Sequence, residues 1–469
     1  MVGGIEYFTE DLRHRLAAVF GSRPWVVASE VVQGATFMAA GLKAAGASDV
    51  VAVGAVMGVG PVPEGIPTMT IGMDGIESML DSIRTADVLF HDPPGNVLAF
   101  IEEWDASGDA RTIVDFTMSG GTVCGRASFG GRGDDWVALE DKLVAREIWR
   151  SAGLRTADDE VVDLSDLAGC LAAHRRLRTD LGTVWAGDNR EGWHGGADGT
   201  YWVPDAEVAH EVVETMRDSH DVARIMPFVE GIPCSVLGMV TADRTIAFRP
   251  MELFIYRDFA AHRIVYGKAS SHWDPPVADR VEMRTAAVAV GEEMRRRADY
   301  RGIFTLDGIM SAEGFVPTEV NPRFGGALPG LLDTPGGLIN LMFVNLCVVE
   351  GELDDIDSAE LERWVLGDLD GRRRGIGMLE TSNAPSDDQQ MFVALDAQGR
   401  LCEVDEAGDA ICNVMWGAKA PHGLIRMIAL DGIEHGSSKA GLFLDIAKFA
   451  DANWNIGIPN LIPATDVRL

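Results

Sequence analysis

One stretch near residue 320 constrains the fold of this chain more than any other. Residues 318–326 read TEVNPRFGG. On a β-strand the side chains of Glu319 and Asn321 point to the same face, because they are two residues apart. Pro322 has no N–H to give to a ladder, so it ends the strand, and Arg323 follows directly. The stretch therefore predicts a strand that delivers an acid, an amide and a guanidinium to one place.

The preceding segment, GIFTLDGIMSAEGFV, predicts the partner strand of a β-hairpin. A three-residue loop over 312–314 would place its glycine in the left-handed conformation that such loops favour. Ser311 would then pair with Phe315, and in the same register Asp307 would pair with Glu319. The hairpin thus predicts two carboxylates that face each other across the ladder.

Directly opposed acids have Cβ atoms about 5 Å apart and repel each other unless a cation compensates them. A hard divalent ion with oxygen ligands meets that need, and Mg²⁺ fits best because it keeps positions for water and phosphate. We therefore predict Asp307, Glu319 and Asn321 as metal ligands. Arg323 would hold a phosphoryl or acyl-phosphate oxygen beside them. The alternative is a solvated hairpin whose acids pair with lysines.

Length and charge narrow the classes of function. The chain has 469 residues, which predicts two to four domains or subdomains. Its 72 acidic and 40 basic side chains give a formal net charge of −32. Such a chain repels nucleic acid and anionic membranes, so neither is an expected partner. An anionic ligand would need a local cationic pocket or a metal.

The sequence predicts a cytoplasmic location. The first residues lack the apolar core of a secretory signal, and no apolar run reaches the length of a membrane span. The cysteines form no C-x-x-C pair, so a disulfide framework or zinc site is not expected, and a reducing compartment fits. They lie at positions 124, 170, 234, 347, 402 and 412.

The chain divides into three predicted regions. Residues 1–133 alternate strand-like apolar runs with helical segments, which predicts a small doubly wound α/β domain. Residues 134–366 would form the central domain, with a small subdomain at about 150–228 and a metal-binding subdomain at about 229–366. Residues 367–469 are richer in strand-like segments than the preceding region, which predicts a mixed α+β extension.

The segments LDGIM and TEVNPRFGG together resemble the magnesium signature of the ATP-grasp ligases, and the resemblance spans about residues 130–345. It implies an α/β ATP-grasp fold behind an N-terminal pre-grasp domain, and binding of MgATP by the hairpin. The segment EDKLVAREIWRSAGLRTA resembles the helix that carries an ATP-contacting lysine in this family, and Lys142 matches that lysine. Taken alone, Lys142 would belong to a solvated helix face shared with Arg146.

Two further segments resemble nucleotide-binding parts of the family. RIMPFVEGIPCSV resembles the hinge whose backbone binds adenine, although an ordinary buried strand is the alternative. NREGWHGGADG resembles the loop that closes over the phosphates, where glycine lets backbone N–H groups approach anionic oxygens. A plain surface loop is the alternative there. The implied nucleotide contacts are Met226, Pro227, Phe228 and Val229 in the hinge, and Arg190, His194, Gly195 and Gly196 in the loop.

The sequence departs from the family at two places. Many members carry a second lysine on the strand before the phosphate loop, but here Trp185 and Ala186 occupy that neighbourhood. Arg190 is the candidate replacement for the missing charge. The hinge also lacks the acid that often follows its glycine, since the chain continues from Gly231 to Ile232.

Within the family, the pre-grasp α/β domain, the variant loop WAGDNREGWHGGA and the C-terminal extension together most resemble the peptide ligases of pheganomycin-type antibiotic biosynthesis. The resemblance implies an amide bond between an amino-acid-like carboxylate and a peptide amine, made through an acyl phosphate with release of ADP and phosphate. Asp307, Glu319 and Arg323 would be the catalytic residues, and a homodimer is a family-level expectation. Two alternatives stay open: a phosphotransferase on the same scaffold, and a nucleotide-binding regulator without turnover.

The net charge of −32 would disfavour an acidic peptide unless basic residues line its entrance. Arg249, Arg257 and Arg263 precede the hairpin on predicted strands and are the candidates for this role. Ordinary surface solvation is the alternative for each of them.

Overall fold

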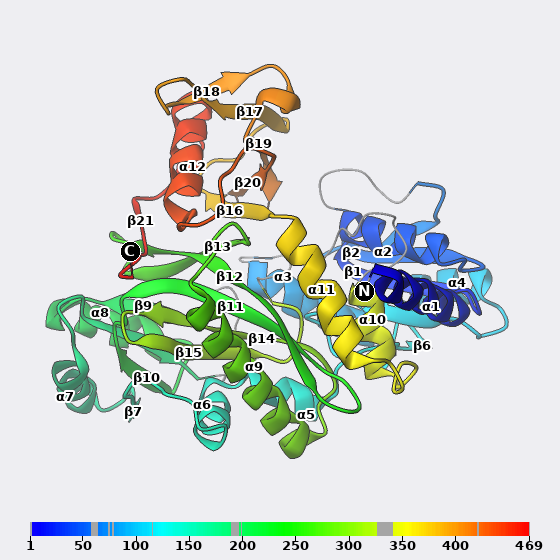
Figure 1. The fold of residues 1–469 in the computed structure, drawn as a ribbon, viewed down its shortest axis with the longest axis horizontal. Helices are drawn as coiled ribbons and strands as arrows, with labels where there is room; N and C mark the ends of the chain where they lie inside the picture. Colours follow the sequence, from blue (N-terminus) through cyan, green and yellow to red (C-terminus); the bar gives the residue numbers. More distant parts are fainter. Residues whose placement is uncertain are drawn as a thin grey trace.

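The computed structural model describes residues 2–57, 64–73, 76, 79–114, 116–188, 197, 199–325, 341–419 and 422–468. Its two large parts are a parallel sheet near the N-terminus and a long antiparallel sheet that fills the rest of the molecule (Figure 1). Among the described residues, no helix combines the length and the apolar character that a bilayer crossing requires.

The N-terminal part is a four-stranded parallel sheet in the order β3-β2-β1-β4. Its inner strands are apolar except for Ser29 and Glu30 near the end of β1, because both faces of the sheet are covered by helices. This arrangement confirms the predicted doubly wound α/β unit. The elements are α1 (Val2–Phe20), β1 (Trp25–Val31), α2 (Val32–Ala44), β2 (Val50–Val56), β3 (Thr68–Thr70), α3 (Met79–His91), α4 (Gly95–Trp104) and β4 (Arg111–Val114), followed by the short hairpin of β5 (Thr122–Val123) and β6 (Arg126–Ala127).

The central part contains the strands in the order β15-β14-β11-β12-β13, all antiparallel. Helices α9 and α6 share one apolar core with strands β11, β14 and β15. The elements are α5 (Asp134–Val137), η1 (Ala138–Glu140), α6 (Lys142–Ser151), β11 (Gly231–Val240), β12 (Thr245–Asp258), β13 (Arg263–Ser270), α9 (Val277–Ala298), β14 (Gly302–Ser311) and β15 (Gly314–Asn321).

A smaller sheet in the order β7-β10-β8-β9 follows α6 and carries two helices on one face, at the lower left of Figure 1. It touches the central sheet where Tyr201 pairs with Arg263. The two sheets therefore meet along β9 and β13. The elements are β7 (Glu160–Asp163), α7 (Leu167–Leu177), β8 (Thr183–Gly187), β9 (Thr200–Val203), α8 (Ala206–Arg217) and β10 (Val222–Pro227).

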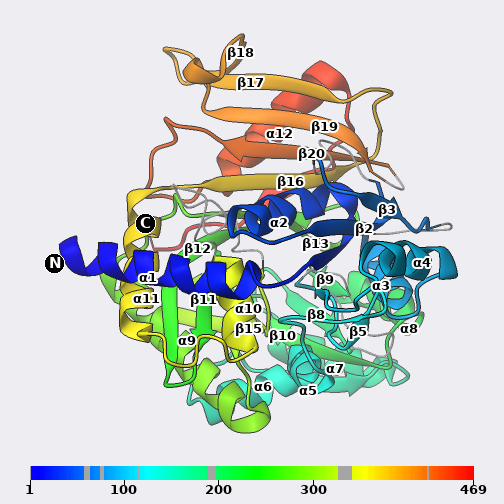
Figure 2. The ribbon, with the colours of Figure 1, turned by 90° about the vertical axis from the view of Figure 1, so that its right-hand side faces the viewer.

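The C-terminal strands continue the central sheet, because β16 pairs with β13. Figure 2 shows them stacked beyond β13 with α12 against them, which confirms the predicted mixed α+β extension. The boundaries proposed at residues 133 and 366 stay predictions. The elements are α10 (Leu341–Val349), α11 (Ser358–Gly371), β16 (Gly375–Thr381), β17 (Gln389–Leu395), β18 (Leu401–Val404), η3 (Ala407–Asp409), β19 (Cys412–Lys419), β20 (His422–Ala429), α12 (Ala440–Trp454) and β21 (Leu461–Pro463).

Candidate active site

The hairpin of β14 and β15 places Asp307 directly opposite Glu319, as predicted. The route to that pairing differs from the expectation. Ser311 pairs with Gly314 rather than with Phe315, because the turn has two residues and Gly314 adopts a φ of +115°. A bulge between Gly308 and Asp307 then leaves Thr318 without a partner across the ladder and restores the register. The predicted loop was therefore wrong, and the predicted pair is right.

Asn321 connects the carboxylate pair to Arg323. Its Nδ2 donates to Asp307 Oδ2 at 3.1 Å, and its Oδ1 accepts from the Arg323 guanidinium at 3.0 Å. The carbonyl oxygen has a second lone pair that a metal ion can use. Ser235 on the neighbouring strand β11 donates to Asp307 Oδ1 at 2.5 Å. No sequence signal singles out Ser235, since only the pairing of β11 with β14 brings it beside Asp307.

The two acids are half-buried and face each other, so their ionisation is disfavoured. Burial raises the pKa of Asp307 to about 7, and the charge of Glu319 adds to this rise. Burial also raises the pKa of Glu319, while the charges of Lys142 and Arg323 oppose that rise. Two facing acids whose ionisation is disfavoured in this way favour the binding of an additional cation. Asp307, Glu319 and Asn321 supply the hard oxygen ligands that Mg²⁺ prefers.

The described residues hold no group of three or more His, Cys, Asp or Glu side chains arranged for a metal ion. The hairpin brings together two carboxylates and one amide instead. A Mg²⁺ ion bound there would complete its octahedral shell with water and phosphate oxygens, as this ion ordinarily does.

Arg323 is fixed from behind by a buried cluster that the sequence did not reveal. Its Nε donates to Glu140 Oε1 at 2.6 Å, and the same oxygen accepts from Arg132 at 2.8 Å. The side chains of Arg323 and Glu140 are 9% and 5% exposed. Arg132 and Glu140 lie more than 180 residues before Arg323, so their contact with it is invisible without the fold.

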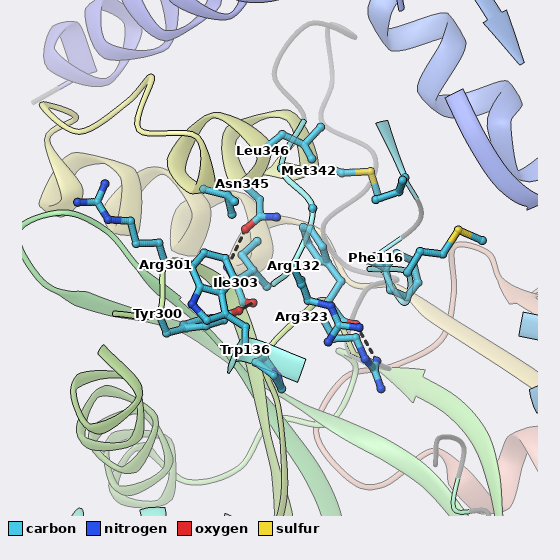
Figure 3. A pocket seen from close by; sticks show the side chains of 17 residues that line it. Phe116, Arg132, Trp136, Tyr300, Arg301, Ile303, Arg323, Met342, Asn345 and Leu346 are labelled. Carbon is cyan, nitrogen blue, oxygen red and sulfur yellow. Dashed lines mark hydrogen bonds between the residues drawn. The ribbon is translucent and has the colours of Figure 1, made fainter. Parts of the chain in front are cut away.

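A small cavity lies beside this cluster, between the N-terminal sheet and the end of the hairpin. Figure 3 shows Arg132 and Arg323 together at its floor, with Phe116 on one side and Trp136 on the other. Its volume is about 30 Å³, which suffices for one or two waters. This cavity is therefore too small to hold a substrate.

Lys142, the first residue of α6, reaches across to the small sheet. Its Nζ lies 3.3 Å from Thr200 Oγ1, and Thr200 pairs with Ala186 on β8. The sequence resemblance predicts that Ala186 lies where many ATP-grasp ligases carry a second lysine. Trp185 points to the opposite face, where it is fully buried against α7 and α8. Lys142 thus brings a positive charge close to Ala186, where the sequence has no lysine.

The predicted phosphate contacts Arg190, His194, Gly195 and Gly196 lie outside the described residues, so their role stays a prediction. The hinge residues Met226 and Pro227 pair with Val184 and Thr183 of β8. The N–H of Phe228 donates to the carbonyl of Gly182 at 3.1 Å. A hydrogen bond from this hinge to adenine would therefore have to use other backbone groups, of which Val229 offers the next.

The predicted substrate arginines lie in different surroundings. Arg257 sits over the rings of Trp202 and Phe228, with its guanidinium carbon 5.1 and 5.2 Å from their centroids, at the hinge. Arg263 is exposed at the start of β13. Arg249 is 3% exposed and forms ion pairs with Asp274 and Asp370.

Eight residues of β12 separate Arg249 from Arg257, which is a distance of about 25 Å along a strand. Arg249 therefore does not share a surface with the other two arginines, and its ion pairs indicate a structural role.

Tyr266 on β13 lies near these residues, although no sequence signal indicated it. Burial raises the pKa of Tyr266, the charges of Asp307 and Glu319 raise it further, and the charge of Arg323 opposes them. Its buried hydroxyl has no hydrogen-bond partner among the described residues. The phenol thus stays protonated close to the carboxylate pair.

Comparison with models of known protein families finds no match, and comparison with curated proteins finds none either. Solved structures do match. A variant of Rhizobium etli pyruvate carboxylase has a TM-score of 0.55 at 15% identity, over 91% of this chain and 37% of its own. Campylobacter jejuni biotin carboxylase, bound to an ATP analogue, has a TM-score of 0.52 at 13% identity, over 94% and 92% of the two chains.

The biotin carboxylase domain of Hydrogenobacter thermophilus 2-oxoglutarate carboxylase has a TM-score of 0.51 at 11% identity, over 94% of this chain and 91% of its own. It was solved as a dimer with MgADP and bicarbonate. At such identities the likeness establishes the fold alone. The fold is the predicted ATP-grasp fold.

Proposed function

We propose that this protein is an ATP- and Mg²⁺-dependent ligase that joins a carboxylate to an amine. The observation that carries the proposal is the directly opposed pair of Asp307 and Glu319. The pair is joined through Asn321 to the guanidinium of Arg323. Two facing acids beside a held guanidinium suit a metal ion and a phosphoryl group, and a merely structural hairpin needs neither.

Asp307, Glu319 and Asn321 would hold Mg²⁺, which neutralises charge on the phosphate oxygens when bound. Lys142 would contact the phosphates from the opposite side. In support, the similar structures of two carboxylases contain an ATP analogue in one case and MgADP in the other. A nucleotide held by Lys142 and the carboxylate pair would lie between the start of α6 and the hairpin.

The reaction proceeds in two steps. A substrate carboxylate oxygen attacks the γ-phosphate of ATP, which forms an acyl phosphate and releases ADP. The amine then attacks the acyl carbon, the C–N bond forms, the nitrogen loses one proton to solvent, and phosphate leaves with the electrons of the C–O bond. Positioning and charge neutralisation dominate such phosphoryl transfers, so the protein needs no covalent intermediate. Arg323, braced by Glu140, would hold the acyl-phosphate oxygens.

We further propose an amino-acid-like acid and a peptide amine as the substrates, in the biosynthesis of a peptide natural product. The support is the sequence resemblance, together with the exposed Arg263 where β13 of the central sheet pairs with β9 of the small sheet. A cytoplasmic location and a homodimer belong to the same proposal.

The test is a screen for ADP and phosphate release with a panel of L-amino acids as acids and triglycine as the amine, followed by mass spectrometry. We expect ADP release that depends on the acid, and an amide product only when the amine is present. Hydroxylamine should trap the acyl phosphate as a hydroxamate. A phosphorylated product that persists with amine present would indicate a phosphotransferase, and binding without turnover would indicate a regulator. AMP as the product would overturn the mechanism.

A further inference from the structure

The hydroxyl group of Tyr266 is buried, and no described residue forms a hydrogen bond with it. Buried polar groups without a partner are uncommon, and each one calls for an explanation. Two other buried tyrosines of this part of the molecule show the usual arrangement. The hydroxyl of Tyr256 donates to the carbonyl of Ala440 at 3.0 Å, and that of Tyr300 donates to the carbonyl of Ile303.

Tyr266 belongs to β13, opposite Ile255 of β12, whereas Arg323 lies just past the end of the hairpin and bonds to Glu140. Asp307, Glu319 and Arg323 are close enough for their charges to act on the phenol. The carboxylate pair therefore has both a guanidinium and an unpartnered hydroxyl in its neighbourhood.

The backbone next to Tyr266 is strained. Lys268 adopts a φ of +84°, a conformation that side chains other than glycine rarely adopt. Its Nζ lies 5.9 Å from the centre of the Tyr266 ring. Strain of this kind tends to occur at ligand-binding and catalytic positions. The part of β13 that carries Tyr266 thus contains a strained backbone conformation at Lys268.

We propose that Tyr266 is a catalytic residue whose hydroxyl donates a hydrogen bond to the acyl oxygen during amide formation. When the amine attacks the acyl carbon, the carbonyl electron pair moves to this oxygen, and it returns when phosphate leaves. A preorganised donor stabilises the oxyanion that exists between these two events. The inference rests on the proposed function and adds a second donor that acts only in its second step.

Arg323 does not fill this role by itself. Its guanidinium is directed to Glu140, Asn321 and the carbonyl of Phe324. These contacts suit a group that holds the acyl phosphate in place. A phenol has an ordinary pKa of about 10, so it is protonated at neutral pH and can donate to a developing negative charge.

The test uses Tyr266→Phe, which removes only the hydroxyl, and Tyr256→Phe as a matched control that removes a bonded one. With the acid and triglycine from the screen, two steps are measured separately. Rapid-quench release of ADP with acid but without amine reports acyl-phosphate formation, and mass spectrometry with amine reports the amide. We expect Tyr266→Phe to slow amide formation by about 100-fold, as loss of one oxyanion donor does, with the ADP burst and the KM for ATP unchanged.

The same variants separate catalysis from structure. Tyr266→Phe should melt no lower than the parent protein, because its hydroxyl has no partner to lose. Tyr256→Phe should melt lower and keep the parent's ratio of the two steps. Parent-like amide formation in Tyr266→Phe, an equal loss of both steps, or a drop in melting temperature like that of the control would overturn the assignment. Absence of any acid-dependent ADP burst in the parent protein would overturn the proposed function and this inference with it.

Discussion

Asp307 and Glu319 lie directly opposite each other on β14 and β15, and a bulge at Thr318 is what aligns them. Both acids are half-buried, and burial raises the pKa of each. Asp307 accepts hydrogen bonds from the hydroxyl of Ser235 and the amide of Asn321, which are neutral groups. The protein therefore stores unfavourable electrostatic energy here, which the binding of a divalent cation would relieve.

The first prediction concerns Asp307→Asn, which should abolish turnover and stabilise the metal-free protein. The pKa of Asp307 is about 7 in the folded state, against an ordinary value of 3.8. As the pH rises, the folded protein therefore keeps this proton to a higher pH than the unfolded chain does. The free energy of unfolding consequently falls between pH 3.8 and about pH 7. The variant should gain about 1–2 kcal/mol above pH 7, after allowance for solvent screening, and nothing below pH 3.8.

Urea unfolding of both proteins in EDTA, at a series of pH values, measures this gain. The exposed Asp405→Asn serves as the control and should change stability at no pH in the series. A variant that keeps full activity would remove the metal assignment, and one whose stability is lower above pH 7 would contradict the account of its burial.

The carboxylate pair could be predicted from sequence because a hairpin is a local structure. Its register depends on residues close in the chain. The predicted length of the turn and the predicted absence of a bulge were both wrong, and the two errors cancelled. The turn is one residue shorter than expected, and the bulge adds that residue back. A bulge has no reliable sequence signal, so only the pattern of acids supported the correct pairing.

The contacts made over long distances could not be predicted. Glu140 holds Arg323 across 183 positions of the chain, and Ser235 meets Asp307 across 72. Tyr266 belongs to β13, which β11 and β12 separate from the hairpin in the sheet, so its closeness to Asp307 also depends on the whole fold. The doubly wound N-terminal unit was predictable, because the largely apolar β1 and β2 flank the helical segment of α2. The burial of Arg249 depends on Asp370, a residue of α11, and was missed for the same reason as Glu140.

The second prediction concerns the cluster behind Arg323. Glu140→Gln keeps the shape of the side chain but leaves two buried guanidinium groups without their shared anion. The loss should be about 3–5 kcal/mol in the free energy of unfolding, and Arg323 should lose its orientation. Glu313→Gln, which breaks an exposed pair with Arg155, is the control and should cost less than about 1 kcal/mol. Equal costs in urea unfolding would show that the buried cluster has no special role.

The third prediction concerns Lys142. Lys142→Met should weaken ATP binding about tenfold or more. The substitution removes the positive charge proposed to contact the phosphates, which also acts on Glu319. Arg150→Met, on the same helix but 57% exposed and 3.7 Å from its partner Asp159, is the control. Calorimetric titration with MgADP measures both. A loss of affinity that is the same in the two variants would mean that the net charge of the helix, and not Lys142 itself, attracts the nucleotide.

The last prediction separates the three arginines that the sequence grouped together. Arg263 is exposed where β13 meets β9, so Arg263→Glu should raise the KM for a peptide amine several-fold and leave the KM for ATP unchanged. Arg257 contacts Phe228 of the hinge, so Arg257→Glu should raise both constants.

Arg249→Met should change neither KM at 25 °C but should lower stability, because it removes the buried cation that pairs with Asp274 and Asp370. Initial rates with acidic and neutral tripeptides measure the first two effects, and thermal unfolding measures the third. In Arg263→Glu, the KM should rise more for the acidic tripeptide than for the neutral one, because the reversed charge repels the acidic peptide. If Arg263→Glu raises the KM for ATP as much as for the peptide, the exposed start of β13 does not form the peptide entrance, and the amine reaches Tyr266 from another side.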